Sequence, residues 1–355
     1  MGRISTTATA RPAPALPRRL APAPAPARRA PRGRAERTGR RAPRRLPDGA
    51  SPRGVASSRS SASSDDAGMG GALQRRGVSK DDLAALLEIS RPCDTLYLHL
   101  TGLARVDDDE IVAVLEDVYE CVARVDPSAE VVPLLERCGW DADAVMALED
   151  RIGDEDHLVT LSLELEEGDA TGETRGGADA GDETVDKTSV GGTFDRMHAG
   201  HRLLLATASA VTRSRDAPTV YVGVTGDVLL RNKRHRDLIE PYEARAAAAA
   251  SFVAKTRPPT APLAVKCGPL DDGPPLAATV ADMRALVVSR ETLAGGEAIQ
   301  EARKDAGLAP LRVTCVGLVK GRAGKGRGED GKVSSTALRA DAADDRERRR
   351  MRGGS

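Results

Sequence analysis

Short apolar runs alternate with longer segments of helical periodicity throughout the second half of the chain. Such runs are typical of buried strands, and apolar residues that recur every three or four positions are typical of amphipathic helices. The strands are predicted at 188–191, 219–224, 263–268, 285–289 and 311–318, and the helices at 201–211, 241–254, 279–284, 296–306 and from Ser334 onward. Parallel neighbours need crossover connections, which cover both faces of a sheet. The pattern predicts a doubly wound α/β domain with a five-stranded parallel sheet at residues 188–340.

A second, smaller globular segment is predicted at residues 78–167. Ser79 is suited to cap a leucine-rich helix, 95–100 is typical of a strand, and 159–165 alternates as a half-buried strand does. Between these strands, one amphipathic helix carries apolar residues at helical spacing, at Ile111, Val114, Leu115, Val118 and Val122. These elements predict a small α+β domain. Its histidines are isolated from other catalytic residue types, so the sequence indicates no role for it.

Three further segments have too few large apolar side chains to form a core. Residues 1–77 are rich in Arg, Ala, Pro and Ser, and we expect them to be disordered. Their acid-poor composition resembles a transit peptide for a plastid or mitochondrion. The alternative is a disordered tail from a compositionally biased genome, with translation from Met69, on a cytoplasmic protein. Residues 168–187 have the composition of a flexible linker, so we expect 188–340 to function without the residues before it. Residues 341–355 form a charged tail.

Composition argues against several classes of partner. The 53 basic and 53 acidic residues cancel, and only 2% of residues are aromatic, which argues against a nucleic-acid groove. No apolar run is long enough to cross a bilayer, so we expect a soluble protein without a membrane partner. The five cysteines lack the paired spacing of a zinc site and are expected to be reduced thiols.

The strongest chemical signal follows the first predicted strand of the larger domain. There the chain reads Gly-Gly-Thr-Phe-Asp-Arg-Met-His-Ala-Gly-His, from Gly191 to His201, and continues into an apolar helix. Backbone amides and the helix dipole attract anions at such a helix start, and glycine lets a phosphate chain approach the backbone. A glycine-rich turn alone is a weak signal. The added pair His198 and His201 makes a nucleotide-phosphate site the better interpretation.

Two motifs resemble the signatures of the HxGH nucleotidyltransferase superfamily, which implies a Rossmann-like fold. The first combines Gly192-Thr193-Phe194-Asp195 with His198-Ala199-Gly200-His201, and the second is Ser334-Ser335-Thr336-Ala337-Leu338-Arg339. Within the superfamily the chain is similar to the eukaryotic phosphopantetheine adenylyltransferases, which include one domain of bifunctional coenzyme A synthase. The similarity also runs through Val222–Val224, Pro241–Tyr242, Pro269–Asp271, Leu286–Ser289 and Lys332–Ser335.

This resemblance implies an enzyme that transfers an adenylyl group from ATP to 4′-phosphopantetheine, giving dephospho-coenzyme A and pyrophosphate. Its implied catalytic residues are His201, Thr193 and Lys233, which would position and neutralise the phosphates, and no covalent nucleophile is required. Lys233 lies in the basic run 231–236, which on its own indicates only a solvated surface. Mg²⁺ is expected to arrive with the phosphates of ATP rather than to occupy a metal site of the protein itself.

The nucleotide-binding residues that the resemblance implies come from both motifs and from one helix between them. They are Gly192, Phe194, His198, Gly200, Arg303, Ser334, Ser335, Thr336 and Arg339. A serine at a helix start is also an ordinary N-cap, so Ser334 has a purely structural alternative. Arg245 is a weaker candidate, because a helix-surface charge explains it too. Two departures from the family pattern, Arg290 and Gln300, bear on the affinity for phosphopantetheine.

Two other functions are open on the sequence. A cytidylyltransferase acting on a phospho-alcohol shares the first motif, although Val288-Ser289 with Glu291-Thr292 favours the pantetheine family. The other is a non-catalytic nucleotide-binding scaffold protein, against which the intact His198, His201 and Lys233 argue. No P-loop spacing surrounds Gly324-Lys325, so a separate dephospho-coenzyme A kinase is the expected partner in the pathway.

Overall fold

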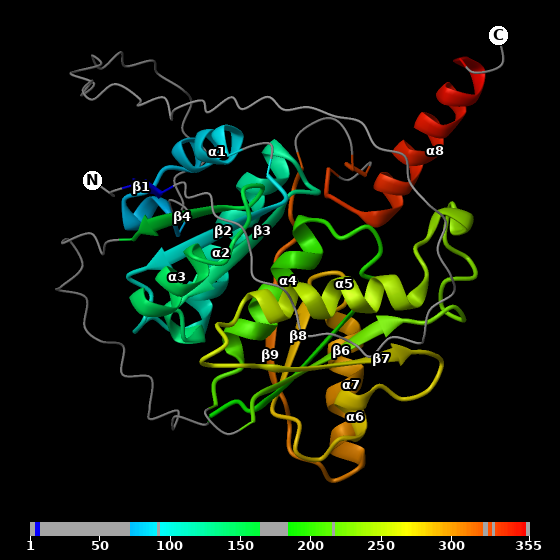
Figure 1. The fold of residues 1–355 in the computed structure, drawn as a ribbon. Helices are drawn as coiled ribbons and strands as arrows, with labels where there is room; N and C mark the ends of the chain where they lie inside the picture. Colours follow the sequence, from blue (N-terminus) through cyan, green and yellow to red (C-terminus); the bar gives the residue numbers. More distant parts are fainter. Residues whose placement is uncertain are drawn as a thin grey trace, which may run out of the picture. The chain divides into compact units, whose positions relative to one another are not determined.

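The computed structural model of the chain, drawn in Figure 1, describes residues 4–7, 72–90, 93–163, 184–214, 217–321, 326–328 and 331–352. Residues 8–71 and 164–183, which hold most of the predicted transit peptide and linker, lie outside the described residues. Two short parts of 1–77 differ from the disorder expected for them. Ile4–Thr7 form strand β1, and Gln74–Arg76 form the 3-10 helix η1.

The larger sheet is parallel throughout, as predicted. It consists of β5 (Lys187–Gly192), β6 (Thr219–Thr225), β7 (Ala264–Leu270), β8 (Ala285–Ser289) and β9 (Arg312–Val316). The strand order is β7-β6-β5-β8-β9, and every neighbouring pair is parallel. The chain turns back past β5 to add β8 and β9, and ligands of such sheets bind at the carboxyl ends beside the point of reversal. The predicted doubly wound α/β fold is confirmed.

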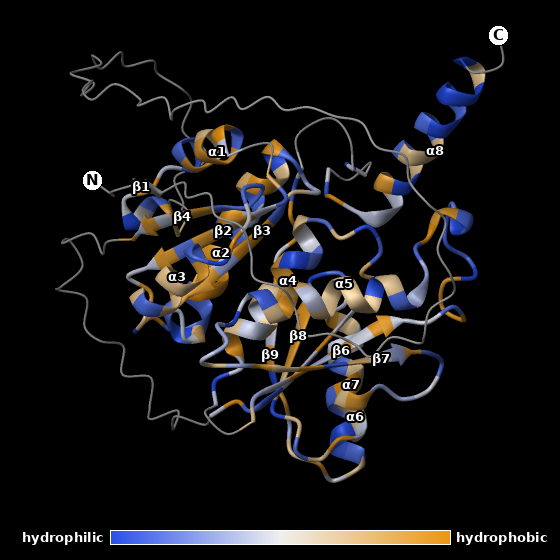
Figure 2. Ribbon diagram, viewed as in Figure 1, coloured by the Kyte–Doolittle hydropathy of each residue, from blue (hydrophilic) through white to orange (hydrophobic). Residues whose placement is uncertain are grey.

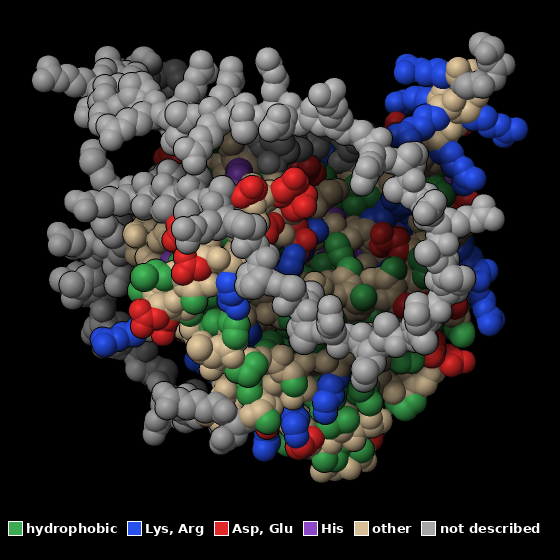
Figure 3. Space-filling model, in the orientation of Figure 1, with side chains coloured by type: hydrophobic (Ala, Val, Ile, Leu, Met, Phe, Trp, Pro, Cys, Tyr) green, Lys and Arg blue, Asp and Glu red, His purple; other side chains and the backbone are tan. Residues whose placement is uncertain are grey.

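Helices cover both faces of this sheet. They are α4 (Ala199–Val211) and α5 (Tyr242–Lys255) on one face, with α6 (Leu276–Thr279) and α7 (Leu293–Asp305) on the other. Alternation along β8 separates the two layers, because Val287 joins the core around α4 whereas Leu286 and Val288 pack with Ala277 of α6. The last helix, α8 (Ser335–Arg352), ends in exposed basic residues that stand out in Figures 2 and 3.

One predicted helix is wrong in position. The pattern placed it at 279–284, but α6 ends at Thr279 and the backbone is extended at Val280 on its way to β8. Pro275 immediately precedes α6, and the missing N–H of proline favours a helix start there. The other helices of this domain, α4, α5 and α7, begin within three residues of their predicted starts.

Residues 72–163 form a region with its own sheet, which we call the first region. Its elements are α1 (Lys80–Ile89), β2 (Thr95–Thr101), α2 (Asp108–Val125), β3 (Glu130–Leu135), η2 (Glu136–Cys138), α3 (Ala142–Glu149) and β4 (His157–Ser162). Strand β2 lies between β3 and β4 and is parallel to both, and β1 adds an antiparallel edge to β4. The predicted cap is present, since the Ser79 hydroxyl accepts a hydrogen bond from the Asp82 amide. Strand β3 and helix α3 were not predicted.

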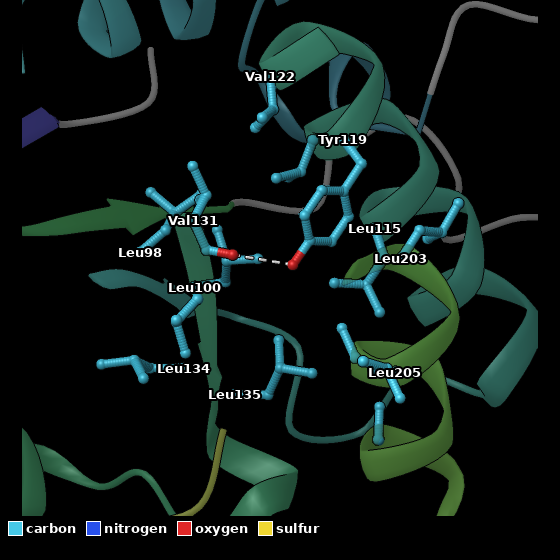
Figure 4. Close-up of a cluster of buried hydrophobic side chains, with 14 of the residues drawn as sticks. Leu98, Leu100, Leu115, Tyr119, Val122, Val131, Leu134, Leu135, Leu203 and Leu205 are labelled. Atoms are coloured by element: carbon cyan, nitrogen blue, oxygen red, sulfur yellow. Dashed lines mark hydrogen bonds between the residues drawn. The ribbon is translucent and has the colours of Figure 1, made fainter. Parts of the chain in front are cut away.

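Helix α4 joins the first region to the larger sheet. Twelve of its residues are buried, from Ala199 through His201 to Val211, which leaves only Gly200 partly exposed. One side packs on β5 and β8, and the other packs on α2. Figure 4 shows Leu203 and Leu205 of α4 in one cluster with Leu115 and Tyr119 of α2. The two regions therefore share a continuous hydrophobic core within the described residues.

Polar contacts cross the same boundary. The indole Nε1 of Trp140 donates to the Thr256 carbonyl at 2.8 Å, and Arg257 Nη1 donates to the Cys138 carbonyl at 3.5 Å. Trp140 is the single tryptophan of the chain and is buried, so its fluorescence reports on this boundary. No helix in the described parts of the chain is both long and apolar enough to span a membrane.

We expect Leu203→Ala to lower the free energy of unfolding by about 2–5 kcal/mol, because the side chain is buried between two regions that cannot collapse onto the cavity. Trp140 emission and far-UV circular dichroism should change in one transition during denaturant unfolding. Leu276→Ala, at a half-exposed leucine, is the control and should cost much less. If the Trp140 emission changed at a much lower denaturant concentration than the circular dichroism signal, the two regions would be shown to unfold independently.

Candidate active site

A cavity of 1390 Å³ opens at the carboxyl ends of β5, β6, β8 and β9. Both sequence motifs contribute to its wall, although their residues are more than a hundred positions apart. Of the predicted site residues, those that line it are Gly192, Thr193, His198, Gly200, His201, Lys233, Ser334, Ser335, Thr336 and Arg339. The structure therefore brings ten of the twelve together.

The N-terminus of α4 faces this cavity. His198 is the N-cap residue and makes no side-chain capping bond, while the Ala199 amide donates to the Pro127 carbonyl at 2.8 Å. The amides of Gly200 and His201 lie in the unbonded first turn and make no hydrogen bond to another described residue. A Cβ on Gly200 would lie 3.2 Å from the His198 ring, so glycine keeps this turn open. Such amides form an anion site together with the helix dipole.

The two motif histidines are stacked and buried. Their ring centroids lie 3.9 Å apart with planes 22° from parallel, and neither Nδ1 atom has a hydrogen-bond partner. Burial, together with the nearby Arg202 guanidinium, lowers the pKa of His198 to about 3. Burial, then His198 and Arg202, hold the pKa of His201 well below its usual 6.5. Both rings are therefore neutral at physiological pH, and each has one N–H to donate to a phosphate oxygen.

The N-terminus of α8 meets the N-terminus of α4 at this point. Ser334 caps α8, because its hydroxyl accepts from the Ala337 amide at 3.2 Å, so the structural alternative for this residue is present. The Ser335 hydroxyl lies 3.5 Å from Nε2 of His198. The Thr336 hydroxyl accepts from Arg339 at 3.1 Å. Two helix starts and two further hydroxyls thus converge on one part of the cavity.

A buried ion pair joins the two motifs. Arg339 Nη1 donates to Asp195 Oδ2 at 2.5 Å, and both side chains are almost fully buried. The other oxygen of Asp195 accepts from the Glu240 amide, and Arg339 also donates to the Arg234 carbonyl. Because each partner compensates the other, the pair fixes α8 against the turn after β5. Asp195 was part of the predicted motif, but its partner could not be read from the sequence.

Arg245 has a similar structural role. It is fully buried, and its Nη1 atom donates to the carbonyls of Thr193 and Thr225, which follow β5 and end β6 respectively. Its Nε atom donates to the Glu240 carbonyl. The guanidinium therefore holds two strand ends at the cavity, and it is not the exposed helix charge that the sequence left as an alternative.

Two predicted nucleotide-binding residues lie outside the cavity wall. Phe194 is buried beneath it, with its ring centroid 5.3 Å from that of His201, and so supports the histidine. Arg303 is fully buried and donates to the carbonyls of Ala277, Val280 and Ala309, which leaves its charge directed at backbone. Both side chains therefore have structural contacts, and their ligand roles stay predictions.

The two departures from the family pattern also lie outside the wall. Gln300 exchanges hydrogen bonds with the backbone amide and carbonyl of Leu311, at 2.9 and 2.8 Å. Its side-chain amide therefore holds β9 near α7. Gln300 does not line the cavity, so an effect on substrate affinity would have to be indirect. Arg290 is exposed, and its amide donates to the Val316 carbonyl.

The cavity has a second, less polar end. Leu270, Ala278 and Ile299 line it there, at the end of β7, in α6 and in α7. Lys233 is exposed and lies in the loop after β6, on the wall of the same cavity. Glu291 pairs with Lys332 on another part of the wall, and neither was among the predicted residues. The cavity can therefore hold an anion at the helix starts and a less polar group beyond β7.

Sequence comparisons identify relatives of the larger domain. The cytidylyltransferase-like family matches residues 189–340. The phosphopantetheine adenylyltransferase of Saccharomyces cerevisiae is 38% identical over 152 residues, which is 43% of this chain and 47% of that protein. The phosphopantetheine adenylyltransferase of Thermococcus gammatolerans is 37% identical over 158 residues, 44% of this chain and 90% of that protein. A solved structure of a protein of unknown function from Archaeoglobus fulgidus is 26% identical and covers 37% of this chain and 88% of its own, with a TM-score of 0.30.

The parallel sheet, the paired helix starts and the family match define the larger domain as a nucleotidyltransferase. More specifically, the chain belongs to the phosphopantetheine adenylyltransferase family, because it covers nine-tenths of the archaeal relative at 37% identity. The match spans about half the length of the yeast relative. The first region lies outside the residues matched by the family.

The lowered pKa values of the two motif histidines predict a loss of stability in acid. Below pH 6.5 the unfolded chain binds protons that the folded chain excludes, so the free energy of unfolding falls as the pH falls toward the folded pKa. His198 should contribute a loss of about 2 kcal/mol by pH 5, and His201 should add a loss of the same sign. Denaturant unfolding at a series of pH values from 8 to 5 measures this fall in the free energy of unfolding. His198→Asn should flatten the profile.

Proposed function

We propose that the larger domain transfers the adenylyl group of ATP to the phosphate of 4′-phosphopantetheine, with dephospho-coenzyme A and pyrophosphate as products. One observation carries the proposal. In a member of this family, the first turns of α4 and α8 meet at one end of the cavity with His198, His201 and Ser335. The opposite end offers less polar walls, which are suited to the pantetheine arm.

The reaction needs charge stabilisation rather than a protein nucleophile. A phosphate oxygen of phosphopantetheine attacks the α-phosphorus of ATP, a new P–O bond forms, and the bond to pyrophosphate breaks. His201 and the first amides of α4 would donate to the α-phosphate and the departing pyrophosphate, with help from Thr193. Lys233, on the opposite loop, would bridge the attacking and α-phosphates. Ser334, Ser335 and Thr336 would hold the β- and γ-phosphates at the start of α8.

Mg²⁺ is expected to enter with the nucleotide. Among the residues that the structure describes, no three His, Cys, Asp or Glu side chains are grouped to hold a metal ion. The carboxylate of the first motif, Asp195, is already paired with Arg339. With its carboxylate already paired, the site fits a Mg²⁺ ion that is held mainly by ATP oxygens and water. Such an ion would neutralise charge on the triphosphate. We also propose that a separate kinase phosphorylates the dephospho-coenzyme A.

A pyrophosphate-release assay that offers ATP and CTP with phosphopantetheine and with phosphorylated alcohols tests the proposed function. We expect ATP with phosphopantetheine to be the preferred pair. ATP and dephospho-coenzyme A should also raise the melting temperature more than CTP does, since a ligand stabilises the state that it binds. Preference for CTP and a phospho-alcohol would assign the domain to the cytidylyltransferases, and binding without turnover would indicate a scaffold protein.

His201→Ala is expected to reduce kcat by about 10²–10³, the range for removal of one donor to a developing negative charge. The dissociation constant of ATP should change much less, because the amides of α4 and the hydroxyls of α8 are still present. Lys233→Ala should lower kcat and also raise the KM for phosphopantetheine, and Lys233→Arg should not restore either value. Arg231→Ala, in the same basic run, is the matched control. Weak ATP binding with kcat near wild type would contradict the assigned roles.

A further inference from the structure

Helix α2 of the first region contacts both ends of strand β9. Asp108, in its first turn, pairs at 2.9 Å with Arg312, the first residue of β9. Glu116, two turns later, accepts at 2.5 Å from the amide of Gly317, the residue after the end of β9. Eight helical residues span about 12 Å and five strand residues about 16 Å, so side-chain length must make up a difference of about 4 Å between the two contacts.

The contact at the start of β9 is anchored deep in the protein. The Asp108 carboxylate is only 1% exposed and faces three guanidinium groups, those of Arg137, Arg213 and Arg312. Arg137 belongs to the first region, and Arg213 follows α4. A buried carboxylate requires such compensation, and here the compensating charges come from both sides of the boundary. Asp108 thus fixes α2 relative to β9.

The contact at the end of β9 reaches the cavity. Gly317 lines the cavity wall, and a Cβ at this position would lie 3.1 Å from Glu116 Oε1, so a larger residue would have to displace the Glu116 carboxylate by a few tenths of an ångström. Two residues later, the Val319 carbonyl accepts from the Val333 amide at 3.0 Å. Val333 immediately precedes Ser334, the N-cap of α8. A short path of backbone bonds therefore leads from Glu116 to the hydroxyls at the start of α8.

The turn that follows α2 contacts residues directly beside two more parts of the cavity wall. The Pro127 carbonyl accepts from the Ala199 amide in the first turn of α4. The Pro127 ring also lies 3.4 Å from where a Cβ of Gly326 would stand, and the Gly326 carbonyl accepts from the Ser334 amide at 3.1 Å. Contacts of Pro127, in the first region, thus help to position the N-termini of both α4 and α8.

We propose that the first region is part of the catalytic machinery, and that Glu116 is a positioning residue that sets the nucleotide end of the cavity through Gly317. Residues 188–340 then need the first region for full activity, in contrast to the expectation from the linker composition that they function without it. The inference rests on the proposed function for the identity of the nucleotide. Glu116 touches no substrate. It holds the segment 317–319 in the position from which Val333 and the start of α8 are placed, and so it acts on the site of the triphosphate and not on the less polar end of the cavity.

Glu116→Ala, Glu116→Gln and the control Glu120→Ala test this role in the full chain. Glu120 lies one turn further along α2, is similarly exposed, and pairs with Lys80 inside the first region. We expect Glu116→Ala to lower kcat/KM for ATP by about 10-fold to 100-fold, the factor for loss of a hydrogen bond to a charged acceptor. The KM for phosphopantetheine should not change. Glu116→Gln keeps an acceptor oxygen and should recover most of the loss, and Glu120→Ala should match wild type.

Hydrogen exchange gives a second measurement that does not depend on turnover. Faster exchange of the amides at 317–321 and 331–336 in Glu116→Ala, with unchanged exchange in Glu120→Ala, supports the proposal. Equal kinetics and exchange in the two alanine variants would overturn it, as would equal rises in KM for both substrates or failure of Glu116→Gln to recover. Absence of pyrophosphate release by the wild-type protein would refute the proposed function instead, and the exchange comparison would still decide the role of Glu116.

Discussion

The burial of α4 is the constraint on which much of the structure depends. A helix with apolar or small side chains in every direction must be covered on every side. In α4 the larger sheet covers one side and α2 covers the other. The helix therefore holds the two regions in one core. Its first turn still faces the cavity, so the dipole and the free amides of a well-buried helix are directed at the site.

The same burial sets the electrostatics of the site. His198 and His201 are surrounded by protein, and Arg202 adds a nearby positive charge, so both rings stay neutral. A neutral imidazole donates one hydrogen bond without the desolvation cost of a buried cation. The positive potential at the cavity comes instead from Lys233 on the exposed loop and from the helix dipoles. Buried arginines such as Arg245 and Arg303 are directed at backbone carbonyls and act as supports.

Much of the larger domain could be predicted because short apolar runs and helical patterns alternate regularly along the chain, and because each of its motifs is contiguous. The first region was predicted less completely. Strand β3 contains Pro133, which argues against a strand, but β3 lies at the edge of its sheet, where proline is tolerated. Arg303 illustrates another limit, because only packing shows that its guanidinium is surrounded by carbonyls. The contact of Glu116 with Gly317 joins residues 201 positions apart and leaves no local pattern.

The cover that α2 provides for α4 distinguishes this chain from its shorter relatives. The Thermococcus protein matches over 90% of its length, and the tenth that is left is too short for a counterpart of residues 72–163. The outward face of its corresponding helix must then meet water or another subunit. Side chains there should be polar in a monomer and apolar in an oligomer, whereas Leu203 and Leu205 here are apolar because a neighbour within the same chain covers them. Because α2 of the same chain packs on the outward face of α4, the side chains on that face need not suit contact with solvent or with a partner subunit.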